Sequence, residues 1–155
     1  MRLTAEDMVG LLQVQHLYGH VLDRFLWEKL DEVFAPDGVF DPSDVGLPVM
    51  RGLAEIRAKL IPLEEGENRD NVHNHVATNP AVISVGEDGV VKMRTKYIVS
   101  SQRDFLAFGE YEDELVKTPT GWRIKYRKTR RLTGHNLPYL AAPPKYETPE
   151  GPRGG

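Results

Sequence analysis

The feature that most constrains this chain of 155 residues is a change in its hydrophobic period near residue 71. Before that point, apolar residues recur every three or four positions, which is the spacing of helices that bury one face. After it, apolar and polar residues alternate, which is typical of strands with one buried face. Helices followed by long antiparallel strands predict an α+β domain, in which a curved sheet packs against the helices and can enclose a pocket.

The N-terminal half predicts three helices. Thr4 is followed by acidic residues and is a candidate N-cap, and the apolar spacing after it predicts a first helix over about 5–27. The run WEKLDEVFAP predicts a second, shorter helix that stops before Pro36 and is followed by a short strand at GVF. The run RGLAEIRAKLIP predicts a third helix that ends near Pro62.

The C-terminal half predicts four strands. In the run VKMRTKYIV, which starts at residue 91, alternate residues share one face and the basic residues share the other; the first set is Val91, Met93, Thr95, Tyr97 and Val99, and the second is Lys92, Arg94 and Lys96. The sequence GEDG at 86–89 predicts the turn that precedes this strand, and the ranges 105–116 and 122–133 predict a further hairpin. A four-residue turn between the last two strands would place Glu114 opposite Lys125 and Glu112 opposite Arg127, as cross-strand ion pairs.

Composition narrows the classes of function. The absence of cysteine excludes thiolate zinc sites, iron–sulfur clusters, cysteine nucleophiles and disulfide scaffolds, and it favours the cytoplasm. With 20 Lys and Arg against 23 Asp and Glu, the net charge of −3 provides no global basic field for nucleic acid or an anionic membrane. No apolar run approaches the roughly 18 residues that a membrane-spanning helix requires. We therefore expect a soluble, cytoplasmic protein whose partner is a small molecule.

Four histidines form two pairs with spacings that metal ligands use. His16 and His20 are four apart on the polar face of the first predicted helix, and His73 and His75 are two apart in an extended segment. A mononuclear metal centre needs at least a third protein ligand, and the strands offer no further histidine except His135. The residues alone favour no metal site here, and the simplest interpretation is one solvated histidine and one that is buried and hydrogen-bonded. A single functional His75 is the interpretation that the resemblance described below favours.

Asp23 lies at the border of the apolar stripe of the first predicted helix. Aspartates in such positions are usually solvated, which is the simpler interpretation. The functional alternative is that Asp23 accepts the Nδ1 proton of an imidazole, fixes its tautomer and stabilises the imidazolium that forms when the histidine takes a proton from a substrate.

Four stretches taken together, LLQVQHLYGHVLDRFLWEKLDEVFAPDGVF, RGLAEIRAKL, HNHVATNPAVISV and GEYEDELVKTPTGWRIKYRK, closely resemble the SnoaL-like family of the NTF2-like superfamily. The resemblance spans residues 7–131 and implies a cone-shaped α+β domain over residues 1–136. In that fold a strongly bent antiparallel sheet wraps around a long N-terminal helix, and two further helices help to enclose a deep apolar pocket.

The resemblance also implies site residues. Tyr18, Asp23 and His75 match the pattern of the branch that contains scytalone dehydratase, bile-acid 7α-dehydratase and hexachlorocyclohexane dehydrochlorinase. In those enzymes an Asp–His dyad abstracts a proton without metal or cofactor. His75 would be the general base, Asp23 its orienting partner and Tyr18 a hydrogen-bond donor to a substrate oxygen. Arg127 matches the dehydrochlorinase's arginine, and it enters the pocket only if a β-bulge intervenes or if its face is the concave one.

The resemblance therefore favours an enzyme, a cofactor-independent lyase of the dehydratase type or an isomerase, acting on a small hydrophobic, cyclic molecule. The alternative is a non-catalytic module that binds a small ligand, or an accessory subunit of a ring-hydroxylating oxygenase. The Pro- and Gly-rich tail at 137–155 is expected to pack on the domain or on a neighbouring subunit. Within it, residues 137–147 would cover the pocket mouth or reach a neighbouring protomer of a homo-oligomer, either a trimer or a dimer.

Overall fold

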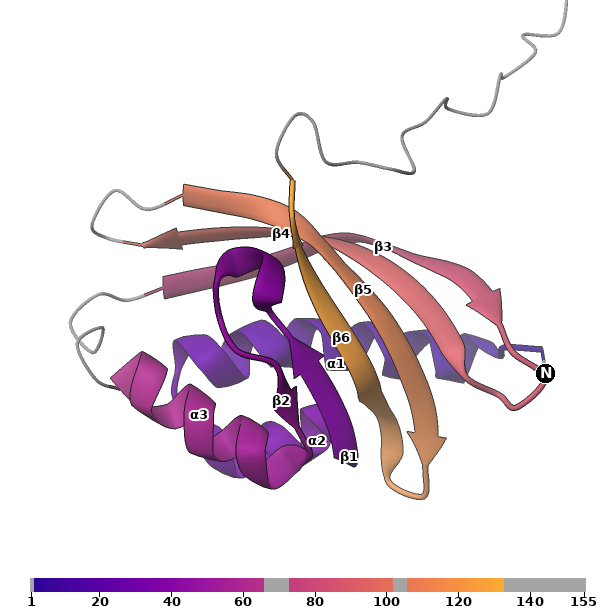
Figure 1. The fold of residues 1–155 in the computed structure, drawn as a ribbon. Helices are drawn as coiled ribbons and strands as arrows, with labels where there is room; N and C mark the ends of the chain where they lie inside the picture. Colours follow the sequence, from indigo (N-terminus) through magenta and orange to yellow (C-terminus); the bar gives the residue numbers. More distant parts are fainter. Residues whose placement is uncertain (1, 66–72, 102–105, 133–155) are drawn as a thin grey trace, which may run out of the picture.

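The computed structural model describes residues 2–65, 73–101 and 106–132, with three α-helices and a six-stranded sheet (Figure 1). The helices are α1 (Ala5–Asp23), α2 (Leu30–Val33) and α3 (Leu53–Glu65), and short 3₁₀ turns occupy Trp27–Lys29 and Ser43–Val45. The strands are β1 (Phe34–Asp41), β2 (Met50–Arg51), β3 (His73–Val85), β4 (Val91–Ser101), β5 (Leu106–Thr118) and β6 (Gly121–Arg131). The predicted tail, residues 137–155, and His135 lie outside the described residues.

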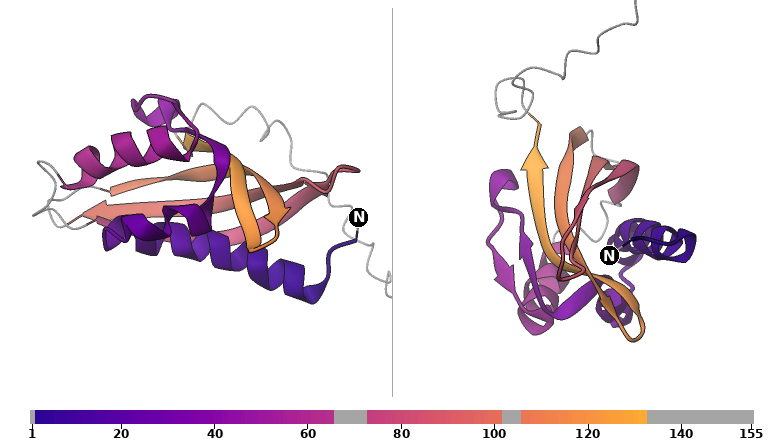
Figure 2. Two further views of the ribbon diagram at one scale, coloured as in Figure 1. Left: turned by 90° about the horizontal axis from the view of Figure 1, so that it is seen from below. Right: turned by 90° about the vertical axis from the view of Figure 1, so that its right-hand side faces the viewer.

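The strands form one mixed sheet in the order β2-β1-β6-β5-β4-β3. Strand β1 pairs with β6 in parallel, and all the other neighbours are antiparallel. The sheet is strongly curved and does not close on itself, so that β3 lies beside α1 while β1 and β2 lie beside α3 (Figures 1 and 2). The protein is therefore an α+β domain, as the change of hydrophobic period predicts, and it has the cone shape that the family resemblance implies.

Helix α1 begins at a capping box and ends earlier than predicted. The Thr4 hydroxyl accepts a hydrogen bond from the Asp7 N–H at 3.1 Å, and the Asp7 carboxylate accepts one from the Thr4 N–H at 3.0 Å. The helix stops at Asp23, not near residue 27, because Phe25 adopts a left-handed conformation with a φ of 54°. The N–H of Leu26 then donates to the carbonyl of Val21 at 2.9 Å, which closes a Schellman-type end without the usual glycine.

The other two helices also differ from their predicted bounds. Strand β1 begins at Phe34, so the second helix is one α-turn after a 3₁₀ turn, and Pro36 lies inside the strand. Helix α3 continues past Pro62 to Glu65, because an exposed proline removes one backbone hydrogen bond without ending the helix. No helix of the described chain is long and apolar enough to cross a membrane.

The core lies between the helices and the concave face of the sheet. Its fully buried side chains are aliphatic or aromatic: Leu11, Val21, Leu30, Phe34, Met50, Ile56, Leu115 and Ile124. Strand β4 directs Val91, Met93, Thr95, Tyr97 and Val99 to this face and Lys92, Arg94 and Lys96 to the outside, as the alternation predicts.

A β-bulge between β5 and β6 overturns the predicted ion pairs. Leu115 pairs with Ile124, but Glu114 pairs with Tyr126, so Lys125 is an extra residue on β6. Glu114 therefore does not lie opposite Lys125, and Asp113, not Glu112, lies opposite Arg127. The extra residue also reverses the alternation along β6, so that Arg127 turns to the inner face.

Candidate active site

The site lies where the backbone of α1 comes close to that of β3. A Cβ atom at Gly19 would lie 2.5 Å from the carbonyl oxygen of His75, a distance that no side chain could occupy. The glycine lets the two backbones approach, and Asp23 lies one helical turn further on the same face of α1. The close approach thus brings the Asp23 carboxylate within reach of His75.

Asp23 and His75 form a doubly hydrogen-bonded pair. The Nδ1 atom of His75 lies 2.5 Å from Oδ1 of Asp23, and the backbone N–H of His75 donates to Oδ2 at 2.9 Å. The His75 side chain is 13% exposed and the Asp23 side chain is 17% exposed, so the pair is sheltered but still reachable. Because the carboxylate holds the Nδ1 side of the ring, Nε2 is the nitrogen left for a ligand. The structure thus brings together the two residues that the sequence singles out as a dyad.

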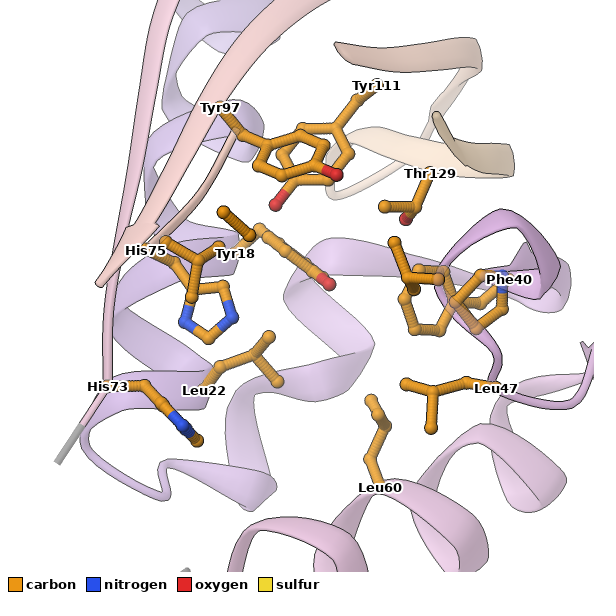
Figure 3. Close-up of a pocket in the computed structure, with 14 residues that line it drawn as sticks. Tyr18, Leu22, Phe40, Leu47, Leu60, His73, His75, Tyr97, Tyr111 and Thr129 are labelled. Carbon is orange, nitrogen blue, oxygen red and sulfur yellow. The ribbon is translucent and has the colours of Figure 1, made fainter. Parts of the chain in front are cut away.

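His75 lines a cavity of about 290 Å³ between the helices and the concave face of the sheet (Figure 3). Most of the wall is apolar or aromatic. The lining residues are Tyr18, Leu22, Phe40, Pro42, Val45, Leu47, Leu60, His73, His75, Tyr97, Val99, Ala107, Tyr111 and Thr129. Among the described residues, no Asp, Glu, Lys or Arg lines this cavity. Such a wall suits a neutral hydrophobic molecule with few polar groups.

Tyr18 lies at the centre of an aromatic cluster beside the dyad. Its ring makes edge-to-face contacts with Phe34 and Phe40, each at 6.1 Å between centroids, with His75 at 6.3 Å and with Tyr111 at 5.5 Å. The hydroxyl points into the cavity (Figure 3). Tyr18 thus stands next to the imidazole, with its hydroxyl directed into the cavity.

Arg127 faces inward but does not line the cavity. Its side chain is fully buried and makes two hydrogen bonds of 2.8 Å to the carboxylate of Asp113 and one of 2.5 Å to Oε1 of Gln15. The guanidinium carbon lies 4.3 Å from the ring centre of Tyr18 and 4.1 Å from that of Tyr111. Burial alone lowers the pKa of Arg127, but the Asp113 carboxylate outweighs this and raises it, so the group stays charged. Arg127 therefore does not contact the cavity itself, but it packs against Tyr18 and Tyr111, which line the cavity.

The other histidines that the structure describes are divided between the surface and the cavity. His16 and His20 are exposed on the polar face of α1, as their helical positions predict. His73 lines the cavity on the same strand face as His75, with 6.1 Å between the ring centres. Within the described ranges, no three His, Asp or Glu side chains are grouped so that they could hold a metal ion.

Sequence reasoning does not identify three lining residues that carry a hydroxyl group, Tyr97, Tyr111 and Thr129. Alternation places Tyr97 on the correct face of its strand, but nothing in the sequence marks it as a site residue. Tyr111 lies beside it on β5, and the two rings are stacked at 4.7 Å. Thr129 could not be assigned to the inner face, because its orientation depends on the bulge in β6.

The sheet curves around a long helix, and a polar pair opens on an apolar cavity. These two features define the structural class of the protein. The chain belongs to the SnoaL-like domain family, whose model matches residues 3–128. It is 26% identical to the anthranilate 1,2-dioxygenase small subunit of Burkholderia cepacia, over 92% of this chain and 99% of that protein.

Solved structures agree with this assignment. A provisionally named aromatic ring hydroxylase of Novosphingobium aromaticivorans is 26% identical, with a TM-score of 0.68 over 85% of this chain and 93% of that one. An NTF2-like protein with a cystatin-like fold from the same organism is 22% identical, with a TM-score of 0.67 over 84% and 85% of the two chains. The latter likeness shows the fold alone.

Proposed function

We propose that the protein is a cofactor-independent lyase or isomerase that acts on a small, neutral, cyclic molecule. The observation that carries this proposal is the Asp23–His75 pair, whose imidazole opens on a largely apolar cavity. A carboxylate on Nδ1 of a histidine is the arrangement that holds the other nitrogen ready as a general base.

In this proposal, Nε2 of His75 removes a proton from a carbon next to an activating carbonyl. The electron pair of the broken C–H bond moves toward the carbonyl oxygen. It then either expels a leaving group from the neighbouring carbon, as in a lyase, or recaptures a proton elsewhere on the ring, as in an isomerase. Asp23 stabilises the imidazolium formed, and the Tyr18 hydroxyl donates a hydrogen bond to the oxygen on which charge develops.

Arg127 has a positioning role in this proposal. Because it is buried behind Tyr18 and paired with Asp113, it holds the tyrosine ring in place without touching the substrate. The absence of Asp, Glu, Lys and Arg from the described lining favours a substrate without a carboxylate.

Hydrogen–deuterium exchange on a small bicyclic ketone tests the proposal without knowledge of the natural substrate. 2-Tetralone carries acidic protons between its carbonyl and its aromatic ring, and NMR in D₂O measures how fast they are replaced. We expect the protein to accelerate this exchange, and His75→Gln and Asp23→Asn each to lower the acceleration by about 10²–10⁴-fold.

His73→Gln is the matched control, since His73 lines the same cavity on the same strand face. It should keep most of the acceleration. Equal rates for the wild type, Asp23→Asn and His75→Gln would refute the general-base proposal.

A second candidate is an accessory subunit of a ring-hydroxylating oxygenase. It is favoured by the match to a dioxygenase small subunit over nearly the full length of both chains. It is also favoured by a row of exposed apolar residues on the outer sheet face, where Val76 pairs with Ile98 and Ile98 with Phe108. In that case Asp23→Asn and His75→Gln should leave oxygenase assembly and turnover unchanged, whereas a charge placed in the row should disrupt assembly.

A further inference from the structure

Two buried hydroxyl groups on the cavity wall lack a hydrogen-bond partner among the described residues. They belong to Tyr97, which is 3% exposed, and Thr129, which is 7% exposed. Buried hydroxyls are normally paired, because an unpaired one loses its hydrogen bonds to water without replacement. Unpaired polar groups in the wall of a cavity therefore point to a ligand that pairs with them.

The fold fixes the position of the Tyr97 hydroxyl. Tyr97 lies opposite Gly109 on β5, and a Cβ atom at Gly109 would be 2.4 Å from both Cζ and the hydroxyl oxygen. The glycine lets the ring lie across β5, where it stacks on Tyr111 with an angle of 24° between the planes. Burial, the largest effect, raises the pKa of Tyr97, so the hydroxyl keeps its proton and can donate it.

Thr129 lies on the next strand, at the register position opposite Tyr111. It faces inward because the extra residue at Lys125 reverses the alternation along β6. In Figure 3, Thr129 and His75 lie on opposite sides of the cavity, and the Tyr97 hydroxyl points toward the side of Thr129. The bulge and the glycine thus bring two hydroxyls to the part of the wall that lies away from the dyad.

We propose that Tyr97 and Thr129 form a polar subsite that binds a second oxygen of the ligand, a hydroxyl or a carbonyl, away from His75. This deepens the proposed function, on which it rests for the orientation of the substrate. The substrate class is then a neutral ring system with an oxygen function at each end. Because a cavity of about 150 Å³ holds benzene, the cavity of about 290 Å³ suits a molecule of two fused rings.

Calorimetric binding of two probes to the full chain tests the subsite. 2,6-Dihydroxynaphthalene has an oxygen at each end, and 2-naphthol has only one. We expect the wild type to prefer the dihydroxy compound, and Tyr97→Phe and Thr129→Val each to reduce this preference by about 2–10-fold, the worth of one hydrogen bond. Thr95→Val is the matched control, since its buried hydroxyl also lacks a described partner but does not line the cavity.

Thermal unfolding of the same variants supplies a second readout. Both substitutions remove an unpaired hydroxyl with little change of shape, so neither should lower the Tm. A preference that survives in both variants, or one that Thr95→Val reduces equally, overturns the subsite. So does a wild type that does not distinguish the probes. Because binding needs no proton transfer, these outcomes are separate from the exchange assay: loss of exchange in His75→Gln with no probe preference would refute the subsite alone.

Discussion

Replacement of Gly19 by alanine should damage the site through the backbone. In an exposed helix interior this substitution stabilises a helix by about 1 kcal/mol. Here the added Cβ would lie 2.5 Å from the carbonyl oxygen of His75, whereas ordinary contact begins at 3.4 Å. Helix α1 and strand β3 must then move apart by about 0.9 Å, the difference between these two distances.

The same movement would break the dyad. The hydrogen bond from the His75 N–H to Asp23 is 2.9 Å long, and a further 0.9 Å takes it beyond hydrogen-bond range. Overpacking costs about 1–3 kcal/mol, and each hydrogen bond lost to a charged group costs about 1.5–3 kcal/mol. These costs exceed the gain in helix propensity, so we expect Gly19→Ala to lower the free energy of unfolding by about 2 kcal/mol or more.

Urea unfolding and 2-tetralone exchange together test this expectation. Gly19→Ala should reduce both the unfolding free energy and the exchange rate. Gly10→Ala is the matched control, because its Cβ would meet only the Trp122 side chain, at 2.8 Å and far along α1 from the dyad. It should affect stability while leaving exchange intact. A Gly19→Ala protein as stable and as active as the wild type would refute the reasoning.

Three further predictions concern other parts of the molecule. Arg127→Met should destabilise the protein by about 3–5 kcal/mol in urea unfolding, because it leaves the Asp113 carboxylate buried and unpaired, and adding Asp113→Leu should restore part of the loss. Burial, the largest effect, raises the pKa of Asp41, but hydrogen bonds from Ser43 and Lys128 outweigh it and lower the pKa to about 2. The ionised form is thus favoured by folding, so the stability that Asp41→Asn removes, up to about 2 kcal/mol, should be constant above about pH 5, decrease as the pH falls through 4 to 2, and vanish near about pH 1. Acid unfolding curves of the two proteins that stay parallel over this range would contradict this. Finally, Phe108→Asp should dissociate any oligomer that forms through the outer sheet face, as light scattering would show, and unchanged assembly would place the interface elsewhere.

The sequence predicts the overall fold because its apolar and polar residues recur at regular spacings. The alternation along β4 and the helical spacing along α1 each determine which side chains are buried, and together they define the α+β class. The dyad was predictable only through the family resemblance, because an aspartate at the stripe border is usually solvated and position alone does not distinguish His75 from His73. Asp23 and His75 come into contact because Gly19 lets the two backbones approach closely. This role of Gly19 is visible only in the structure.

The features that the sequence does not predict are local departures from this regular spacing of apolar residues. Phe25 ends α1 in a left-handed conformation that sequence reasoning reserves for glycine or asparagine. The extra residue at Lys125 shifts the register of β6, so the faces of Arg127 and Thr129 were reversed relative to simple alternation. A single inserted residue therefore decided which side chains support the cavity.

The most direct test of the central claim is the tautomer of His75, read from the nitrogen chemical shifts of its imidazole by NMR at about pH 8.5. The account predicts a proton on Nδ1, held by Asp23, and an unprotonated Nε2 whose shift moves when 2-naphthol enters the cavity. Asp23→Asn should abolish this preference for the Nδ1–H form. A wild-type imidazole protonated on Nε2, or an Nε2 shift indifferent to a bound ligand, would contradict the claim that His75 presents a base to the cavity.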